Sequence, residues 1–474
     1  MLALLLILAS FAGWQCRPTP PPARPNVLLI FMDDLGWPAI SANGGGLVPT
    51  PHIDALARDG MRFTDAYATP QCTPSRAALL TGQHTARNRM WHVIPGYQYP
   101  YMGQQEPPYL ENLPFETHTL AEALKAQGYA TGILGQWHLN VYGPVGYYTR
   151  LFATHAHEYG FDSVDPATDP AEYQGKVDKG VRWLTDQAIG FLRAHRDTTF
   201  FLYLAHHTIH GPVLAPDSLV EKYRRQGYPD QGLNHARYLA AIEHFDRETG
   251  RLLDSLDALG LRDNTLVLFT SDNGGVDAEY SNAPFRYGKG TLYKGGTRVP
   301  WLLRWPAQVA PGTVCTTPVH LMDVYPTLLA AAGGAPAPGH VFDGMSLLPL
   351  LHGDTIPRRD MYTFAPLYDR GWGATPGVSI RRGDFKLIHF FGDYVDRDDS
   401  SRYLPGPRTE LYDLAADPGE TLDLADNLPR QTADLRAALQ AWLDTMAPGL
   451  PVPNPAFDPD SLWVRRSLAE TAPQ

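Results

Sequence analysis

The strongest constraint on the fold is a repeated alternation of short apolar runs with longer segments whose apolar residues have helical spacing. The apolar runs have the length of strands and contain no charged side chain; they cover residues 26–31, 129–134, 200–205, 265–270 and 299–303. The helical segments cover residues 50–58, 119–128, 177–196, 235–259 and 323–332. Strands that are apolar throughout are buried on both faces. The alternation therefore predicts an α/β domain with a large mixed, mostly parallel sheet between two layers of helices.

A different pattern begins after about residue 349. Residues 378–389 predict a hairpin, residues 410–414 another strand and residues 432–446 a final helix. We therefore expect a smaller antiparallel sheet with a helix packed on it. A chain of 474 residues is long enough for two domains. We predict a large domain over residues 26–349 and a smaller domain, with its tail, over residues 350–474.

The start of the chain has the composition of an export leader. Residues 1–12 are almost entirely apolar but too few to span a bilayer, which is typical of a signal peptide core. Cys16 follows, and residues 17–25 form a Pro-rich tether. This order predicts an exported protein, periplasmic or at the cell surface, and leaves two alternatives open. Either Cys16 carries a lipid anchor, which would be the only membrane contact, or the leader is a plain signal peptide.

Charge and cysteine content exclude other classes. The net charge is −11, so no overall basic field would gather nucleic acid. The three cysteines are too few for a disulfide framework.

The segment that carries the most chemical information is residues 72–76, which read Cys-Thr-Pro-Ser-Arg. Pro74 suits the first turn of a helix, so Cys72 lies at or just before a helix N-terminus. Unpaired backbone N–H groups and the helix dipole attract anions to such a position, and Arg76 is one turn further on. The alternative is a buried free cysteine that happens to precede a helix.

Acidic residues follow two of the predicted strands. Asp33 and Asp34 come directly after residues 26–31, and Asp272 and Asn273 follow residues 265–270. Ligand sites in such sheets lie beyond the carboxyl ends of the strands. Taken singly, either pair would be typical of a turn. Together, four oxygen-bearing side chains predict a site for a hard cation such as Ca²⁺ or Mg²⁺.

Residues 72–82, Cys-Thr-Pro-Ser-Arg-Ala-Ala-Leu-Leu-Thr-Gly, resemble the signature of the sulfatase family. The resemblance extends over nearly the whole chain after the tether and includes the phrase Leu-Tyr-Asp-Leu at residues 411–414. It implies an alkaline phosphatase-like fold with a smaller C-terminal domain. It also implies that a maturation enzyme converts Cys72 to formylglycine, an aldehyde. One divalent cation, Ca²⁺ first and Mg²⁺ as the alternative, would be bound by Asp33, Asp34, Asp272, Asn273 and the formylglycine at Cys72.

The resemblance implies further site residues. His138, in Gly-Gln-Trp-His-Leu at residues 135–139, corresponds to the histidine beside the formylglycine. His210 matches the functional histidine of residues 206–212, His-His-Thr-Ile-His-Gly-Pro, where His207 would line the pocket and His206 be structural. Three histidines this close also suggest zinc, but the spacing gives no helical i, i+4 pair with a nearby acid. Lys289 takes the place of the lysine that contacts the sulfate and the leaving-group oxygen.

The implied mechanism uses the two hydroxyls of a hydrated aldehyde: one attacks sulfur, and the other, deprotonated by His138, allows sulfate to be expelled. Arg76 and the cation would stabilise negative charge, while Lys289 and His210 would stabilise or protonate the leaving group. One residue departs from the pattern, because Gln136 stands where the family has lysine and would bind substrate without a charge. Loss of one such donor lowers turnover roughly 10²–10³-fold in other enzymes. Arg87 or Arg89 is predicted to compensate if either enters the pocket.

We therefore predict a sulfuric ester hydrolase that acts on a carbohydrate or aryl sulfate. The aromatic residues 97–101 fit two interpretations equally: side chains that stack on a sugar ring, or a loop that packs on the core. One alternative is a phosphodiesterase or phosphonate monoester hydrolase of the same superfamily. The other is a non-catalytic, glycan-binding relative, which only Gln136 favours.

Overall fold

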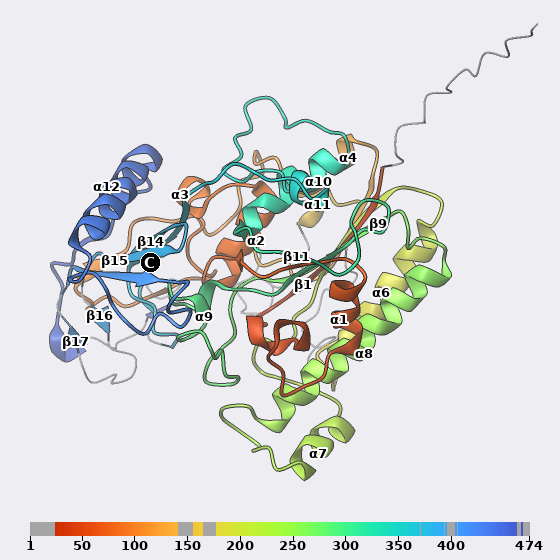
Figure 1. Ribbon diagram of the computed structural model, residues 1–474, viewed down its shortest axis with the longest axis horizontal. Helices are drawn as coiled ribbons and strands as arrows, with labels where there is room; N and C mark the ends of the chain where they lie inside the picture. The colour runs from red at the N-terminus through yellow and green to blue at the C-terminus, as the bar shows by residue number, and fades with distance from the viewer. Residues whose placement is uncertain are drawn as a thin grey trace, which may run out of the picture.

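The computed structural model describes residues 24–140, 155–164, 177–369, 371–392, 394–395, 403–404, 406–461 and 466–467 (Figure 1). The predicted signal peptide, Cys16 and nearly all of the tether lie outside the described residues. Among the described helices, none has both the length and the apolar character needed to cross a membrane.

The centre of the molecule is an eight-stranded sheet with the order β11-β2-β10-β9-β1-β8-β6-β7. Strand β1 lies between β8 and β9 and is parallel to both, and β6 is parallel to β8. Strand β10 is antiparallel to β9 and β2, so the sheet is mixed but mostly parallel, as predicted. The strands are β1 (Asn26–Met32), β2 (Met61–Phe63), β6 (Ala130–Gly135), β7 (Ser163–Val164), β8 (Phe200–Ala205), β9 (Thr265–Ser271), β10 (Trp301–Arg304) and β11 (Thr313–Cys315).

Helices cover both faces of this sheet, which explains why its central strands are apolar throughout. Alternate side chains of β1 enter two different cores: Leu28 packs with the first layer and Leu29 with the second. The first layer contains α1 (Pro51–Arg58), α6 (Val181–Ala194) and α8 (Ala236–Ala258). The second contains α2 (Cys72–Thr81), α4 (Leu120–Ala126) and α10 (Val324–Ala331).

Local sequence signals set several helix ends. Thr119 and Glu122 form the expected capping box at the start of α4, each side chain accepting a hydrogen bond from the other residue's backbone N–H. Helix α2 ends at Gly82, which has φ +66° and lies against Phe342 so closely that a Cβ there would clash. The prediction was wrong at two helix starts. Residues 177–180 form a turn, so α6 begins only at Val181, and the final helix begins at Pro429 rather than at residue 432.

A smaller antiparallel sheet lies beside the large one and carries helix α12 (Pro429–Met446), as Figure 1 shows on the left. Its strand order is β13-β14-β15-β18, and β14 and β15 form the predicted hairpin. Leu435, Leu439 and Leu443 of α12 share a core with this sheet. The strands are β13 (Met361–Ala365), β14 (Gly377–Arg382), β15 (Phe385–Phe390) and β18 (Arg408–Asp413). The domain boundary at residues 349–350 stays a prediction.

The remaining elements are short connections. The helices are α3 (Thr85–Asn88), α7 (Asp217–Arg225), α9 (Lys294–Thr297) and α11 (Leu348–Leu351), with 3₁₀ turns at Trp37–Ala39, Ser41–Asn43, Ala156–Tyr159, Leu321–Asp323 and Pro459–Ser461. The strands are β3 (Ala66–Tyr67), β4 (Tyr97–Gln98), β5 (Gln104–Gln105), β12 (Val319–His320), β16 (Tyr394–Val395), β17 (Tyr403–Leu404), β19 (Val452–Pro453) and β20 (Arg466–Ser467).

A buried ion pair within the C-terminal region connects the smaller sheet to residues 292–294, and we expect its loss to destabilise the protein. Lys386 on β15 donates to Glu420 Oε1 at 2.6 Å and to the Leu292 carbonyl at 2.7 Å, while Glu420 Oε2 accepts from the Lys294 N–H. Burial lowers the pKa of Lys386, although the Glu420 carboxylate opposes that shift. Glu420→Gln leaves a buried ammonium without its counter-charge and should lower the free energy of unfolding by about 3–5 kcal/mol.

Urea denaturation followed by circular dichroism measures this effect. The control is Glu221→Gln, which removes an exposed carboxylate paired with Arg225 and should change the free energy by less than about 0.5 kcal/mol. Equal unfolding midpoints for the two variants would contradict the assigned role of the Lys386–Glu420 pair.

Candidate active site

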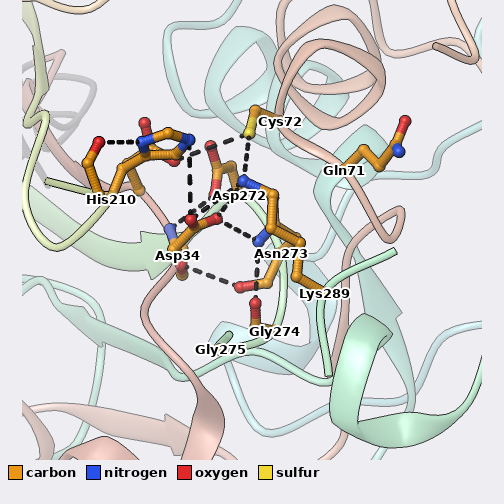
Figure 2. Close-up of polar contacts among 12 residues, drawn as sticks. Asp34, Gln71, Cys72, His210, Asp272, Asn273, Gly274, Gly275 and Lys289 are labelled. Carbon is orange, nitrogen blue, oxygen red and sulfur yellow. Dashed lines mark hydrogen bonds and ion pairs between the residues drawn. The ribbon is translucent and has the colours of Figure 1, made fainter. Parts of the chain in front are cut away.

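The acidic residues meet because β1 and β9 are parallel neighbours in register. Met32 pairs with Ser271, so the next residues, Asp33 and Asp272, leave the sheet side by side. The backbone N–H of Asp34 donates to Asp272 Oδ1 at 3.1 Å. Figure 2 shows the side chains of this loop region gathered around Cys72. Ligand atoms of Asp33, Asp34, Cys72 and Asp272 all lie within 4.8 Å of one another.

Cys72 is the first residue of α2 and its side chain is fully buried above the acidic residues. Its Sγ lies 3.7 Å from Asp33 Oδ1 and accepts a hydrogen bond from Lys289 Nζ at 3.2 Å. Burial raises the pKa of the Cys72 thiol well above its usual range. An unmodified cysteine here is therefore a protonated thiol and a poor nucleophile.

Two buried cations pair with these carboxyl groups. Arg76 Nη2 donates to Asp272 Oδ2 at 2.8 Å, and Lys289 Nζ lies 2.7 Å from Asp34 Oδ1. Burial alone would lower the pKa of Lys289, but the charges of the neighbouring carboxyl groups, that of Asp34 first, raise it well above its usual range. Both side chains are therefore positively charged at neutral pH.

Three buried carboxyl groups and two permanent cations leave an excess of acid. Burial, followed by repulsion from Asp33, raises the pKa of Asp272 to about 8. Burial also raises the pKa of Asp33, but His210, Arg76 and Lys289 outweigh it, and the net shift is downward. The cluster would thus accommodate one more positive charge.

The oxygen atoms available as metal ligands suit a hard cation. Asp33 Oδ2 and Asn273 Oδ1 are buried, and neither has a hydrogen-bond donor among the described residues. Asn273 reaches the cluster through Nδ2, which donates to Asp34 Oδ1 at 2.8 Å. Oxygen ligands from carboxylates and an amide suit Ca²⁺ or Mg²⁺ rather than a softer metal. Within the described chain, both possible clusters of metal-binding side chains include Asp33 and Cys72.

His138 lies beside the start of α2. Its backbone carbonyl accepts from Thr73 Oγ1 at 3.1 Å, and its Nε2 lies 2.8 Å from the Ile94 carbonyl. Because a carbonyl only accepts, Nε2 carries the proton and Nδ1 has a lone pair. Gln136 Nε2 is 3.3 Å from that Nδ1, while the Gln136 carbonyl accepts from Arg76.

The histidines after β8 have different surroundings. His210 Nε2 lies 3.9 Å from Asp34 Oδ2, and burial followed by the charge of Lys289 lowers the His210 pKa. His207 is buried, and burial lowers its pKa well below the usual range. His206 packs edge-to-face on Phe245, with ring centroids 4.9 Å apart.

The arginines proposed to replace the missing family lysine bind elsewhere. Arg87 pairs with Asp343 at 2.7 Å, and Arg89 donates to the Pro108 carbonyl at 3.1 Å. Their proximity in sequence to the signature helix was misleading, because α3 directs both side chains to other partners. Sequence reasoning did not single out Lys179, although this residue lies beside the candidate site. Its ammonium donates to the carbonyls of His210 and Gly211.

Trp372 was also missed, although its indole lies over the ammonium of Lys289 with 4.4 Å between Nζ and the ring centroid. Neither Lys179 nor Trp372 lies in a motif, so only their position in the fold connects them with the site.

Comparisons with known proteins place the chain in a family. The Sulfatase family model matches residues 25–335, and the model for the C-terminal part of N-sulphoglucosamine sulphohydrolase matches residues 285–447. Arylsulfatase A of Homo sapiens is 34% identical over 92% of this chain and 89% of its own length. N-acetylgalactosamine-6-sulfatase of Mus musculus is 29% identical over 95% of this chain and 91% of its own length. The fold and these matches define the class as sulfuric ester hydrolases.

The chain belongs to the sulfatase family. Among solved structures, the protein Ps i-CgsB aligns with a TM-score of 0.71 and 26% identity, over 88% of this chain and 92% of that one. A sulfatase from Pseudoalteromonas sp. aligns with a TM-score of 0.68 and 25% identity, over 92% of each chain. The predicted family and alkaline phosphatase-like fold are thus confirmed.

Proposed function

We propose that this sulfatase hydrolyses the sulfate ester of a carbohydrate or aryl alcohol through a formylglycine at position 72 and one bound divalent cation. The observation that supports this most strongly is the buried Cys72, held between Lys289 and three carboxyl groups at the start of a helix. A thiol with a raised pKa does not suit nucleophilic attack, whereas conversion to an aldehyde gives the position a use. A separate maturation enzyme would carry out that conversion.

The formylglycine hydrate would supply a nucleophilic hydroxyl, with a second hydroxyl on the same carbon that permits release of sulfate. The cation, Ca²⁺ in the first instance and Mg²⁺ as the alternative, would supply positive charge beside that hydroxyl. Asp33, Asp34, Asp272 and Asn273 would hold it. The two oxygens without hydrogen-bond donors, Asp33 Oδ2 and Asn273 Oδ1, support this set.

The chain's own cations would bind the sulfate group. The N-terminus of α2 directs its backbone N–H groups toward the position of residue 72, and Arg76 and Lys289 lie on either side of the carboxyl cluster. These charges are in place before substrate arrives, so they can stabilise a more negative transition state without reorganisation. Lys289, whose Nζ lies 3.2 Å from Cys72 Sγ, would be the cation that stabilises the leaving-group oxygen.

The two histidines would handle protons. His138 has a lone pair on Nδ1 and can accept a proton from a hydroxyl at residue 72. Burial, followed by the charge of Lys289, lowers the pKa of His210. An anionic substrate beside its Nε2 would favour protonation, and the ring could then donate to the departing oxygen.

Two further proteins indicate the range of substrates. Ps i-CgsB has been solved with k-i-k-neocarrahexaose, which favours a sulfated sugar for this chain. A phosphonate monoester hydrolase of Agrobacterium radiobacter aligns with a TM-score of 0.64 at 22% identity, which shows the fold alone. It keeps phosphonate or phosphodiester hydrolysis as the second candidate function.

Parallel assays separate these candidates. We expect protein co-expressed with a maturation enzyme to release sulfate from 4-nitrophenyl sulfate or from a sulfated sugar. It should hydrolyse bis(4-nitrophenyl) phosphate and phenyl phosphonate esters more slowly. The reverse order would favour the phosphonate hydrolase, and binding of sulfated glycan without any turnover would favour the non-catalytic relative.

Gln136 offers a test of the sulfate-binding charges. A lysine at this position would add a cation to an over-acidic cluster, so we expect Gln136→Lys to raise kcat/KM for 4-nitrophenyl sulfate by up to about 10²-fold. Gln136→Met, which fills the same volume without charge, is the control. A folded Gln136→Lys variant without any gain would mean that the missing charge is already supplied, and Lys179 beside His210 is then the candidate.

We also propose that the protein is exported, to the periplasm or the cell surface. The apolar leader supports this, while Cys16 as a lipid attachment site stays a prediction.

A further inference from the structure

One turn of the C-terminal region reaches the catalytic lysine. Asp369 and Ala374 pair through two backbone hydrogen bonds of 3.1 and 2.8 Å, and Asp369 Oδ1 accepts from the Gly371 N–H at 2.8 Å. Asp369 is buried and also accepts from the Tyr99 hydroxyl at 3.4 Å. The ends of the turn are therefore tightly held, which fixes the position of Trp372 between them.

The indole of Trp372 forms part of the active-site wall. Its ring lies over Lys289 Nζ at 4.4 Å, close enough for a cation–π interaction. Gly290 makes this approach possible: it has φ +88°, and a Cβ there would lie 2.6 Å from the Trp372 Cβ. The side chain is only partly buried, so some of this large apolar surface remains open beside a buried cation.

The place of the indole relative to the reacting atoms follows from the contacts of Lys289. The ammonium donates to Cys72 Sγ at 3.2 Å and pairs with Asp34, so it lies at the nucleophile. In the proposed function it also meets the leaving-group oxygen. A group next to Lys289, such as the Trp372 indole, would therefore lie next to the alcohol that the ester bond releases.

A cavity also borders this turn. Tyr368, directly before Asp369, lines a cavity of about 370 Å³ whose other walls come largely from polar side chains. The Tyr368 N–H donates to Glu106 Oε1 at 3.1 Å, which joins this turn to the opposite wall. Side-chain amides donate and accept hydrogen bonds, as sugar hydroxyls require. The amide-bearing lining residues are Gln98, Gln104, Gln105 and Asn454.

We propose that Trp372 is a specificity-determining residue: its indole packs against the ring of the leaving group, so the site favours sulfate esters of ring-bearing alcohols. This inference rests on the proposed function, because it needs an ester whose alcohol leaves beside Lys289. Contact with an aromatic side chain adds affinity for a ring but none for a free sulfate ion. The indole thus acts on the alcohol, while Arg76 and Lys289 act on the sulfate group.

Kinetics on Trp372 variants test the proposal. For Trp372→Ala we expect the KM for 4-nitrophenyl sulfate to rise about tenfold, while the inhibition constant of inorganic sulfate stays within about twofold. Trp372→Phe should recover most of the loss because it restores an aromatic face. The control is Trp183→Ala, which removes a half-buried indole from α6 and should change neither constant. Equal changes for sulfate and ester would mean that Trp372 only positions Lys289, and an unchanged KM would overturn the proposal.

Calorimetry on the Cys72→Ala background separates this proposal from the proposed function. Binding of 4-nitrophenyl sulfate to that variant should weaken about tenfold when Trp372→Ala is added. If the wild-type protein binds the ester but releases no sulfate, the proposed function fails while the role of Trp372 is still measured. If adding Trp372→Ala leaves binding unchanged, or the ester does not bind at all, the role of Trp372 fails.

Discussion

Cys72→Ala is expected to abolish turnover, lowering kcat for 4-nitrophenyl sulfate by at least about 10⁴-fold. The physical reason is that the variant can form no aldehyde, and therefore has no hydroxyl pair at the start of α2. Nothing else in the cluster replaces it, because Asp33 and Asp34 would hold the cation and Lys289 is a protonated ammonium. Mass spectrometry of the tryptic peptide with residue 72 should show the thiol exchanged for an aldehyde in the active wild type.

The second buried cysteine provides a matched control. Cys315 lies on β11, and burial raises its pKa as it does for Cys72, but Asp65 is the acidic group beside it. Cys315→Ala should leave both the aldehyde at residue 72 and kcat unchanged. If the wild-type protein keeps its thiol at residue 72 and still releases sulfate, the proposed nucleophile is wrong.

Removal of the cation is the second large effect that we expect. Treatment with a chelator should lower kcat by at least about 10²-fold, because one source of transition-state charge stabilisation is lost. It should also lower the melting temperature, since a ligand bound at 100 times its Kd stabilises the folded state by about 2.7 kcal/mol. Added Ca²⁺ should restore both quantities, and Mg²⁺ should do so less well.

Asp272→Asn tests which residues hold the cation. The variant loses one carboxylate and leaves Arg76 without its nearest partner at 2.8 Å, so Ca²⁺ should no longer raise the melting temperature. Asp257→Asn is the control, because Asp257 pairs with Arg262 and Arg304 and belongs to neither cluster of metal-binding side chains in the described part of the chain. A chelator without effect on wild-type activity would refute the cation-dependent mechanism.

Much of the fold could be predicted from short-range patterns. The run at residues 26–31 contains only residues that suit a strand buried on both faces, and β1 indeed has α-helices on each side. Thr119 and Glu122 specify a helix start through their own hydrogen bonds. The start of α6 could not be placed as well, because Asp178 satisfies the first N–H groups of that helix from a turn whose sequence also has helical spacing.

The candidate site also contains residues that local motifs predict and residues that only the fold connects with it. Motifs located Asp33, Cys72 and Asp272, since each directly follows a strand or begins a helix. The predicted entry of Arg87 into the pocket was wrong, because Arg87 pairs with Asp343, which is distant in sequence. Trp372 carried no signal, because the turn that holds it over Lys289 is stabilised by Tyr99 from another part of the chain.

The sequence by itself determined the alternating strands and helices and predicted the nucleophile position and the oxygen-rich ligand set, because these depend on residue type and on spacing within a few turns. Only the tertiary structure decided that Asp33 and Asp272 lie side by side, that Lys289 joins Asp34 to Cys72 and that Trp372 covers Lys289. Each of these contacts requires the order of strands in the sheet and the packing of the second sheet against it. Those depend on burial of apolar surface over the whole chain, which no local pattern records.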